Sequence, residues 1–204
     1  MRQIVCFGDS NTYGYKPDQT GRYDETVRWT GRLQNKFGKE ANIIEEGLCG
    51  RTTVFMDEFR EGRRGIDTIG CVMETHNPID ILVIMLGTND CKTRYGASAG
   101  TIAKGLEQVI EKAKEKATKD FKLLILSPIH LGKNVGEAGF DPEFDQKSEE
   151  TALQLAEAYQ KVAEEFQAEF LDAARFASPS GTDREHLDEE GHRKLAEAVY
   201  QAIN

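Results

Sequence analysis

Five short apolar segments alternate along this chain with longer segments whose apolar residues recur at helical spacing, and this alternation strongly constrains the fold. The apolar segments, which we expect to be strands, are residues 4–7, 41–45, 79–86, 121–126 and 169–172. The expected helices are residues 29–37, 63–76, 98–117, 147–167 and 188–203. The third and fourth apolar segments are nearly continuous, as strands covered on both faces are. The pattern predicts an α/β fold, a three-layer α/β/α sandwich around a five-stranded parallel sheet.

The order of the strands determines where such a sheet binds a ligand. We expect the flavodoxin-like order 2-1-3-4-5, in which the order reverses between the first and third strands. Ligands of open parallel sheets bind at the carboxyl ends of the strands beside such a reversal. Ser10 follows the first strand and residues 87–90 follow the third. Both segments should therefore open into one crevice.

Length, charge and cysteine content limit the class of protein. A chain of 204 residues is expected to form one domain, residues 1–204. Its net charge of -9 argues against nucleic acid or an anionic membrane as the main partner. No apolar run approaches the ~20 residues of a membrane span, and no signal peptide is expected because the first apolar run is too short. The four cysteines form no CxxC pair, so we expect neither a zinc knuckle nor a redox dithiol, and a cytoplasmic location is the default.

Ser10 is the candidate nucleophile, because it directly follows the first expected strand. Asp183 and His186 stand three residues apart near the other end of the chain. One turn of chain can bring the Asp183 carboxylate against Nδ1 of His186 and leave Nε2 free to take the serine proton. The three residues supply the nucleophile, base and orienting acid that acyl transfer needs. Each also has a plainer interpretation: Ser10 as a turn cap, and Asp183 with His186 as a surface ion pair.

Three hydrogen-bond donors flank the predicted crevice: the backbone N–H of Ser10, the backbone N–H of Gly50 and the side-chain amide of Asn89. Gly50 follows the second strand, where glycine lets the backbone approach a substrate closely. Asn89 follows the third strand. Donors placed in this way stabilise the oxyanion that develops on an attacked carbonyl. Taken singly, Gly50 and Asn89 would be turn residues, but their joint placement favours the oxyanion role.

Four sequence blocks, in this order, resemble the SGNH hydrolase superfamily of GDSL esterases and lipases. The blocks are Gly8-Asp9-Ser10, Gly50, Gly87-Thr88-Asn89-Asp90 and Asp183-x-x-His186. The similarity extends over nearly the whole chain and is greatest to the bacterial arylesterase and acyltransferase branch, in residues 6–15, 27–31, 45–53 and 84–90. The chain departs from the superfamily at Asn11, where the name motif has leucine.

The resemblance implies a serine esterase that hydrolyses small, short-chain carboxylic esters through an acyl-enzyme. Aryl, acetyl and acetylated-sugar esters are the implied substrates, and acyl transfer to alcohols or peroxide is an implied further activity. The implied catalytic residues are Ser10, Asp183 and His186, with Ser10, Gly50 and Asn89 as the oxyanion hole. Neither a cofactor nor a metal is expected. The implied partners are a small-molecule ester and further copies of the chain in a homo-oligomer.

Two other classes of function stay open at this point. The first is a metal-dependent phosphoesterase that uses Asp9, Asp90 and Asp183, although Asp9 and Asp90 can equally bind the backbone of their own turns. The second is a non-catalytic binding module on the same fold.

Several residues near the nucleophile are candidates for lining a substrate pocket. They are Asn11, Tyr13, Trp29 and His130. Trp29 is equally consistent with a core position, and His192 is expected to be a solvated residue of the last helix. The long loops 16–26 and 131–146 are of a length that is often functional.

Ser98 is an alternative nucleophile, because residues 96–100 match the G-x-S-x-G elbow of α/β-hydrolases. That elbow requires a sharp turn from a strand into a helix. The third strand ends well before Ser98, so the required context is missing. We interpret Ser98 as the cap of the helix that follows.

Overall fold

The computed structural model describes residues 1–204, and its centre is one five-stranded sheet. The strands are β1 (Arg2–Gly8), β2 (Ala41–Gly47), β3 (Ile81–Met85), β4 (Lys122–Ser127) and β5 (Glu169–Asp172). They lie in the order β2-β1-β3-β4-β5, and every neighbouring pair is parallel. The predicted fold class and strand order are confirmed, including the reversal between β1 and β3.

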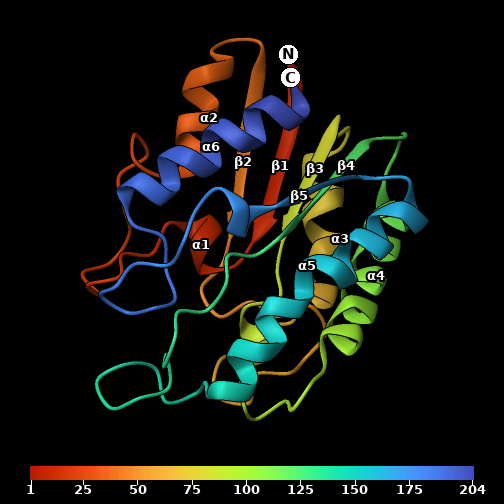
Figure 1. The fold of residues 1–204 in the computed structure, drawn as a ribbon. Helices are drawn as coiled ribbons and strands as arrows, with labels where there is room; N and C mark the ends of the chain where they lie inside the picture. The colour runs from red at the N-terminus through yellow and green to blue at the C-terminus, as the bar shows by residue number, and fades with distance from the viewer.

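Helices cover both faces of the sheet (Figure 1). The long helices are α2 (Trp29–Phe37), α3 (Gly65–His76), α4 (Ala99–Lys116), α5 (Gln146–Phe166) and α6 (Glu189–Ile203). Helices α2 and α6 pack against each other on one face, and α4 packs between α3 and α5 on the other. The sheet therefore forms the middle layer of three.

Side chains of β1 alternate between two hydrophobic cores, as the two-residue period of a strand requires. Val5 and Phe7 belong to the core beneath α3, α4 and α5. Ile4 and Cys6 belong to the core beneath α2 and α6. Because both faces of β1 are covered, its residues 4–7 are continuously apolar.

Short helical turns begin where two central strands end. Helix α1 (Ser10–Tyr13) follows β1, and the 3-10 turn η1 (Asn89–Cys91) follows β3; a second 3-10 turn, η2 (Ala173–Arg175), follows β5. The Asp9 carboxylate caps α1 by accepting a hydrogen bond from the Asn11 N–H at 3.0 Å. Ser98 caps α4 by accepting one from the Thr101 N–H at 3.2 Å, as its sequence context predicted.

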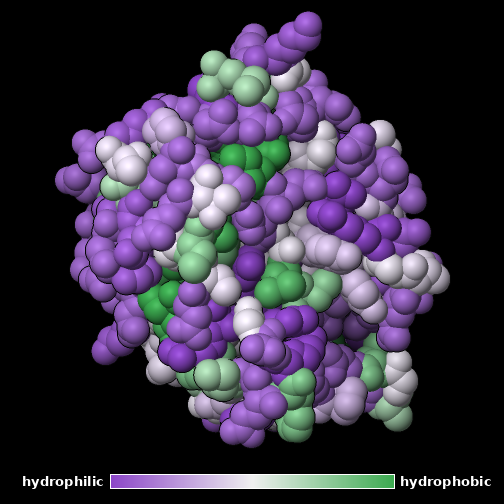
Figure 2. All heavy atoms as spheres, turned by 180° about the vertical axis from the view of Figure 1, so that it is seen from behind, coloured by the Kyte–Doolittle hydropathy of each residue, from purple (hydrophilic) through white to green (hydrophobic).

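The two ends of the chain lie side by side at the opposite end of the sheet from α1 (Figure 1). There Arg2 Nη1 donates a hydrogen bond to the Ile203 carbonyl at 3.3 Å. The face drawn in Figure 2 is mainly hydrophilic, and its hydrophobic residues form small, separate patches. None of the helices combines the length and apolarity needed to cross a membrane.

Candidate active site

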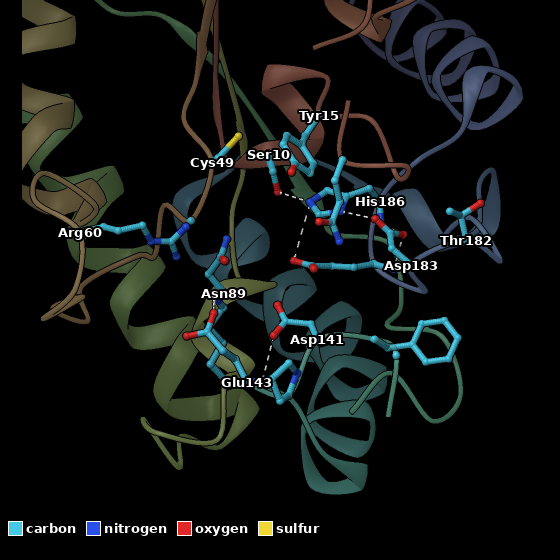
Figure 3. Close-up of a pocket in the computed structure, with 17 residues that line it drawn as sticks. Ser10, Tyr15, Cys49, Arg60, Asn89, Asp141, Glu143, Thr182, Asp183 and His186 are labelled. Carbon is cyan, nitrogen blue, oxygen red and sulfur yellow. Dashed lines mark hydrogen bonds and ion pairs between the residues drawn. The ribbon is translucent and has the colours of Figure 1, made fainter. Parts of the chain in front are cut away.

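Ser10 is the first residue of α1, and its side chain lines a pocket at the carboxyl ends of the strands (Figure 3). The cavity has a volume of about 420 Å³. The segments after β1, β2 and β3 line it together with the loop before α6. The crevice expected beside the strand reversal is therefore present, and Ser10, Gly50, Asn89, Asp183 and His186 all line it.

The Ser10, His186 and Asp183 side chains form one hydrogen-bonded series (Figure 3). Ser10 Oγ lies 2.8 Å from His186 Nε2, and His186 Nδ1 lies 2.6 Å from Asp183 Oδ2. The second Asp183 oxygen accepts hydrogen bonds from the backbone N–H groups of Glu185 and His186, each at 3.0 Å. The carboxylate beside Nδ1 favours the tautomer that carries its proton there, which leaves Nε2 able to accept the serine proton.

The charges around His186 favour its protonated form. Burial acts against the imidazolium, but the Glu185 and Asp183 carboxylates outweigh burial and raise the pKa of His186 above its ordinary value. The Tyr15 ring packs against the imidazole with the ring centroids 5.0 Å apart. The neighbouring carboxylates stabilise the imidazolium cation that forms when the His186 ring takes a proton.

Gly50 and Asn89 present donors to the same pocket. Gly50 has a φ of +81°, and a Cβ at this position would lie 2.4 Å from a guanidinium nitrogen of Arg60. The positive φ therefore favours glycine at this position, and a larger residue would also displace the end of the Arg60 side chain. The Gly50 N–H donates no hydrogen bond within the protein. One N–H of the Asn89 amide donates to the Arg51 carbonyl at 3.1 Å, and the other has no protein acceptor.

Buried polar contacts join the two loops that carry these donors. Asp90 Oδ1 accepts a hydrogen bond from the Thr53 N–H at 2.9 Å and another from the Thr53 hydroxyl. Arg51 donates to the carbonyls of Gly8, at 3.0 Å, and Glu46.

Burial raises the pKa of Asp9 to about 7 and that of Asp90 to about 6. Asp9, Asp90 and Asp183 thus each contact a different part of the protein, and no metal-ligating cluster of three side chains forms.

The four weaker pocket candidates do not line the pocket. Asn11 is buried beside it, where Oδ1 accepts from the Leu187 N–H at 2.9 Å and Nδ2 donates to the Glu185 carbonyl at 3.4 Å. Its amide joins α1 to the loop that carries His186, which a leucine side chain cannot do.

The other three candidates lie outside the pocket lining, and Trp29 takes the core position that the sequence had left open. Trp29 is fully buried in the core beneath α2 and α6. The Tyr13 ring packs under the Arg22 guanidinium, 4.4 Å from its centroid. His130 is half-buried at the start of the loop after β4. The residues of that loop that line the pocket come later in the sequence.

His192 is also a correction, because it is fully buried rather than solvated. Its Nδ1 accepts a hydrogen bond from the Trp29 N–H at 3.3 Å, and its ring packs edge-on against Tyr23 at 5.3 Å. Burial lowers the pKa of His192 to about 3. It is therefore a neutral core residue of the face that α2 and α6 cover.

Sequence reasoning missed several residues of the pocket. The loop 131–146 contributes a wall at 139–143, and the loop 16–26 contributes Gln19. Lys92 is buried and pairs with Glu143 of that wall. Glu185 also lines the pocket, and its position directly before His186 is the signal that could have found it.

A serine, a histidine and a carboxylate hydrogen-bonded in series are the arrangement by which hydrolases of several folds activate a serine for acyl transfer. Residues 6–194 match the model of the GDSL-like lipase/acylhydrolase family, and the chain belongs to this family.

Two solved structures resemble the chain over nearly its whole length. The M. smegmatis aryl esterase is 31% identical with a TM-score of 0.93, covering 100% of this chain and 98% of that one. A carbohydrate acetylesterase family member from Sinorhizobium meliloti is 31% identical with a TM-score of 0.92, covering 100% and 97%. An acetylxylan esterase of Xylanibacter ruminicola is 23% identical and covers 98% of this chain. This chain spans only 43% of the length of that relative.

Proposed function

We propose that this chain is a serine esterase that hydrolyses small, short-chain esters through an acyl-enzyme on Ser10. The observation that carries the proposal is the 2.8 Å contact between Ser10 Oγ and His186 Nε2 inside the pocket. A serine hydroxyl is a weak nucleophile until a neighbouring base takes its proton. His186 is in contact with that proton, and Asp183 fixes the orientation of the imidazole ring.

The proposed reaction has two halves. Ser10 Oγ attacks the ester carbonyl carbon while its proton passes to Nε2 of His186, and Asp183 stabilises the imidazolium. The oxyanion accepts hydrogen bonds from the Ser10 and Gly50 N–H groups and from the Asn89 amide. The intermediate then expels the alcohol, which takes the proton from Nε2. Water attacks the acyl-enzyme by the same route in the second half, and the carboxylic acid leaves as Ser10 regains its proton.

The size and polarity of the pocket favour small esters. Only three of its 17 lining residues are hydrophobic, which provides little apolar surface for a long acyl chain. Short acyl groups on an aryl or sugar alcohol suit the cavity, as the names of the similar arylesterase and acetylesterase also suggest. If an alcohol attacks the acyl-enzyme in place of water, the product is a new ester and the reaction is an acyl transfer.

The alternatives have less support. A metal-dependent phosphoesterase would need Asp9, Asp90 and Asp183 to converge on one ion, whereas each is engaged with a different part of the protein. A pure binding module has no need of an imidazole aligned between a hydroxyl and a carboxylate.

Replacing Ser10 by alanine tests the nucleophile. The Ser10→Ala variant should lower kcat for p-nitrophenyl acetate by at least about 10³-fold, because no acyl-enzyme can form. The stoichiometric burst of nitrophenol should also disappear, while circular dichroism shows an intact fold.

The matched control is Ser98→Ala, at the serine of the G-x-S-x-G match. It removes a helix cap and should reduce stability by about 1 kcal/mol while the burst remains. Full activity of Ser10→Ala, or loss of the burst in Ser98→Ala alone, would refute the proposed nucleophile.

A further inference from the structure

Glu185 is a largely buried carboxylate that lines the pocket and accepts no hydrogen bond from a side chain or backbone group of the protein. The residue is 8% exposed and lines the cavity beside His186. Its Oε1 lies 3.8 Å from His186 Nε2, which is beyond hydrogen-bonding distance. Lys92 lines the same pocket but pairs with Glu143 instead. A largely buried carboxylate is stabilised by a hydrogen-bond donor. Because Glu185 lines the pocket, a molecule bound there can supply that donor.

Two side chains hold the backbone of Glu185 in place beside the pocket. Its N–H donates to Asp183 Oδ1 at 3.0 Å, and its carbonyl accepts from Asn11 Nδ2 at 3.4 Å. The same two side chains bind the neighbouring backbone N–H groups of His186 and Leu187. The backbone from which the Glu185 and His186 side chains project is therefore anchored at both residues.

The distance of 3.8 Å between Oε1 and Nε2 suits one oxygen atom shared by both groups. An oxygen about 2.8 Å from each can donate one hydrogen bond to the imidazole and another to the carboxylate. In the free protein Nε2 accepts from Ser10. Once Ser10 carries an acyl group its oxygen has no proton, so the Nε2 lone pair becomes available to the attacking molecule.

We propose that Glu185 positions the water that resolves the acyl-enzyme and thereby favours hydrolysis over acyl transfer to alcohols. The inference rests on the proposed function. Water has two O–H donors and can bind His186 and Glu185 at once. A simple alcohol has one O–H, so when that group donates to His186 it has nothing to donate to Glu185.

The chemical step balances without a change in the charge of Glu185. The water oxygen forms a bond to the acyl carbon and gives one proton to Nε2 of His186. Its second proton stays on oxygen and donates to the Glu185 carboxylate. The bond between the acyl carbon and Ser10 Oγ then breaks, and Nε2 returns its proton to Oγ. The carboxylic acid leaves with the second proton.

The partition of the acyl group between water and an alcohol measures this role directly. Purified protein is given p-nitrophenyl acetate and 1-propanol at pH 8, and the initial rates of acetate and propyl acetate formation are compared. In Glu185→Leu the ratio of hydrolysis to transfer should fall by about tenfold, the usual effect of losing a hydrogen bond to a charged group. In Glu185→Gln, which keeps an acceptor oxygen and the side-chain shape, the fall should be smaller.

Asp141→Asn is the matched control, because it removes a negative charge that lines the same pocket and acts on Glu185. The partition ratio should change less in this variant than in either Glu185 variant, because the Glu185 carboxylate is kept. A wild-type ratio in both Glu185 variants would overturn the inference. An equal change in Glu185→Gln and Asp141→Asn would overturn it too, because the charge of the pocket would then explain the effect.

The burst of nitrophenol separates this inference from the proposed function. Wild-type protein with neither a burst nor propyl acetate would overturn both. A normal burst in every variant with an unchanged partition ratio would overturn the role of Glu185 alone. The supporting result is a normal burst in Glu185→Leu followed by slower release of acetate and a larger share of propyl acetate.

Discussion

At the scale of single residues, the site concentrates negative charge around one imidazole. Asp183 contacts Nδ1 of His186, and Glu185 lies on the Nε2 side. Asp9 is fully buried nearby and also favours the protonated ring. These carboxylates make His186 a stronger base than an isolated histidine, because they stabilise the imidazolium that proton transfer creates.

The pH dependence of activity should reflect the negative charges around His186. Burial disfavours the imidazolium, but Glu185 and Asp183 outweigh burial and raise the pKa of His186. The neutral ring is the active base, so kcat/KM should fall as the pH drops through a midpoint above about 6.5, the value for an unperturbed histidine. Rates for an aryl acetate between pH 5 and pH 9 give this midpoint, and Glu185→Gln should move it to lower pH. A midpoint at or below the unperturbed value would contradict the electrostatic argument.

At the scale of elements, the oxyanion donors depend on contacts between two loops rather than on one loop. Gly50 follows β2 and Asn89 begins η1 after β3. The Thr53 to Asp90 and Asn89 to Arg51 hydrogen bonds join these segments beneath the pocket. Because parallel strands end at the same edge of the sheet, the two loops are brought close enough for these bonds to form.

Removing the Thr53 hydroxyl tests this coupling between loops. Thr53→Val keeps the backbone N–H but leaves the buried Asp90 carboxylate with one donor fewer, so the free energy of unfolding should fall by about 1–3 kcal/mol. A displaced oxyanion site should lower kcat more than it changes KM. Urea unfolding and steady-state kinetics measure the two effects.

Thr68→Val is the control for that experiment, because the Thr68 hydroxyl binds the Gly65 carbonyl within α3. Its kcat should stay at the wild-type value. Equal kinetics for Thr53→Val and wild type would show that the loops do not need this contact to place their donors.

At the scale of the whole molecule, stability is unevenly distributed. Strands β1 and β3 are central, and nearly all their side chains are buried between two helical layers. The loops 16–26 and 131–146 border the pocket and contain many exposed residues, although Leu131, Val135 and Phe144 of the second loop are buried. Backbone amides in buried strands are protected from hydrogen exchange better than amides in exposed loops.

Hydrogen exchange followed by mass spectrometry should therefore show the slowest exchange in peptides from β1, β3 and β4. Peptides from 16–26 and 131–146 should exchange early, because few of their backbone groups belong to the sheet or the long helices. Exchange in the loop 131–146 as slow as in β3 would contradict this picture. It would mean that the pocket wall belongs to the stable core.

The sequence by itself determined the layered fold and the edge at which the site forms. Short apolar segments and helical periodicity are local properties, and they identified the strands and helices before any contact was known. The strand order then predicted that Ser10 and the segment beginning at Gly87 open into one crevice, as the structure shows. The third strand, β3, is shorter than its apolar segment, because the buried residues Ile79 and Leu86 lie outside the ladder.

Tertiary structure alone decided which distant side chains meet. His192 is buried because Trp29 and Tyr23, which come from the other end of the chain, surround it. Likewise, the contact of Asn11 with Leu187 joins residues 176 positions apart, and Lys92 pairs with Glu143 from the loop before α5. Periodicity acts over a few residues, whereas these contacts arise only when whole layers pack together.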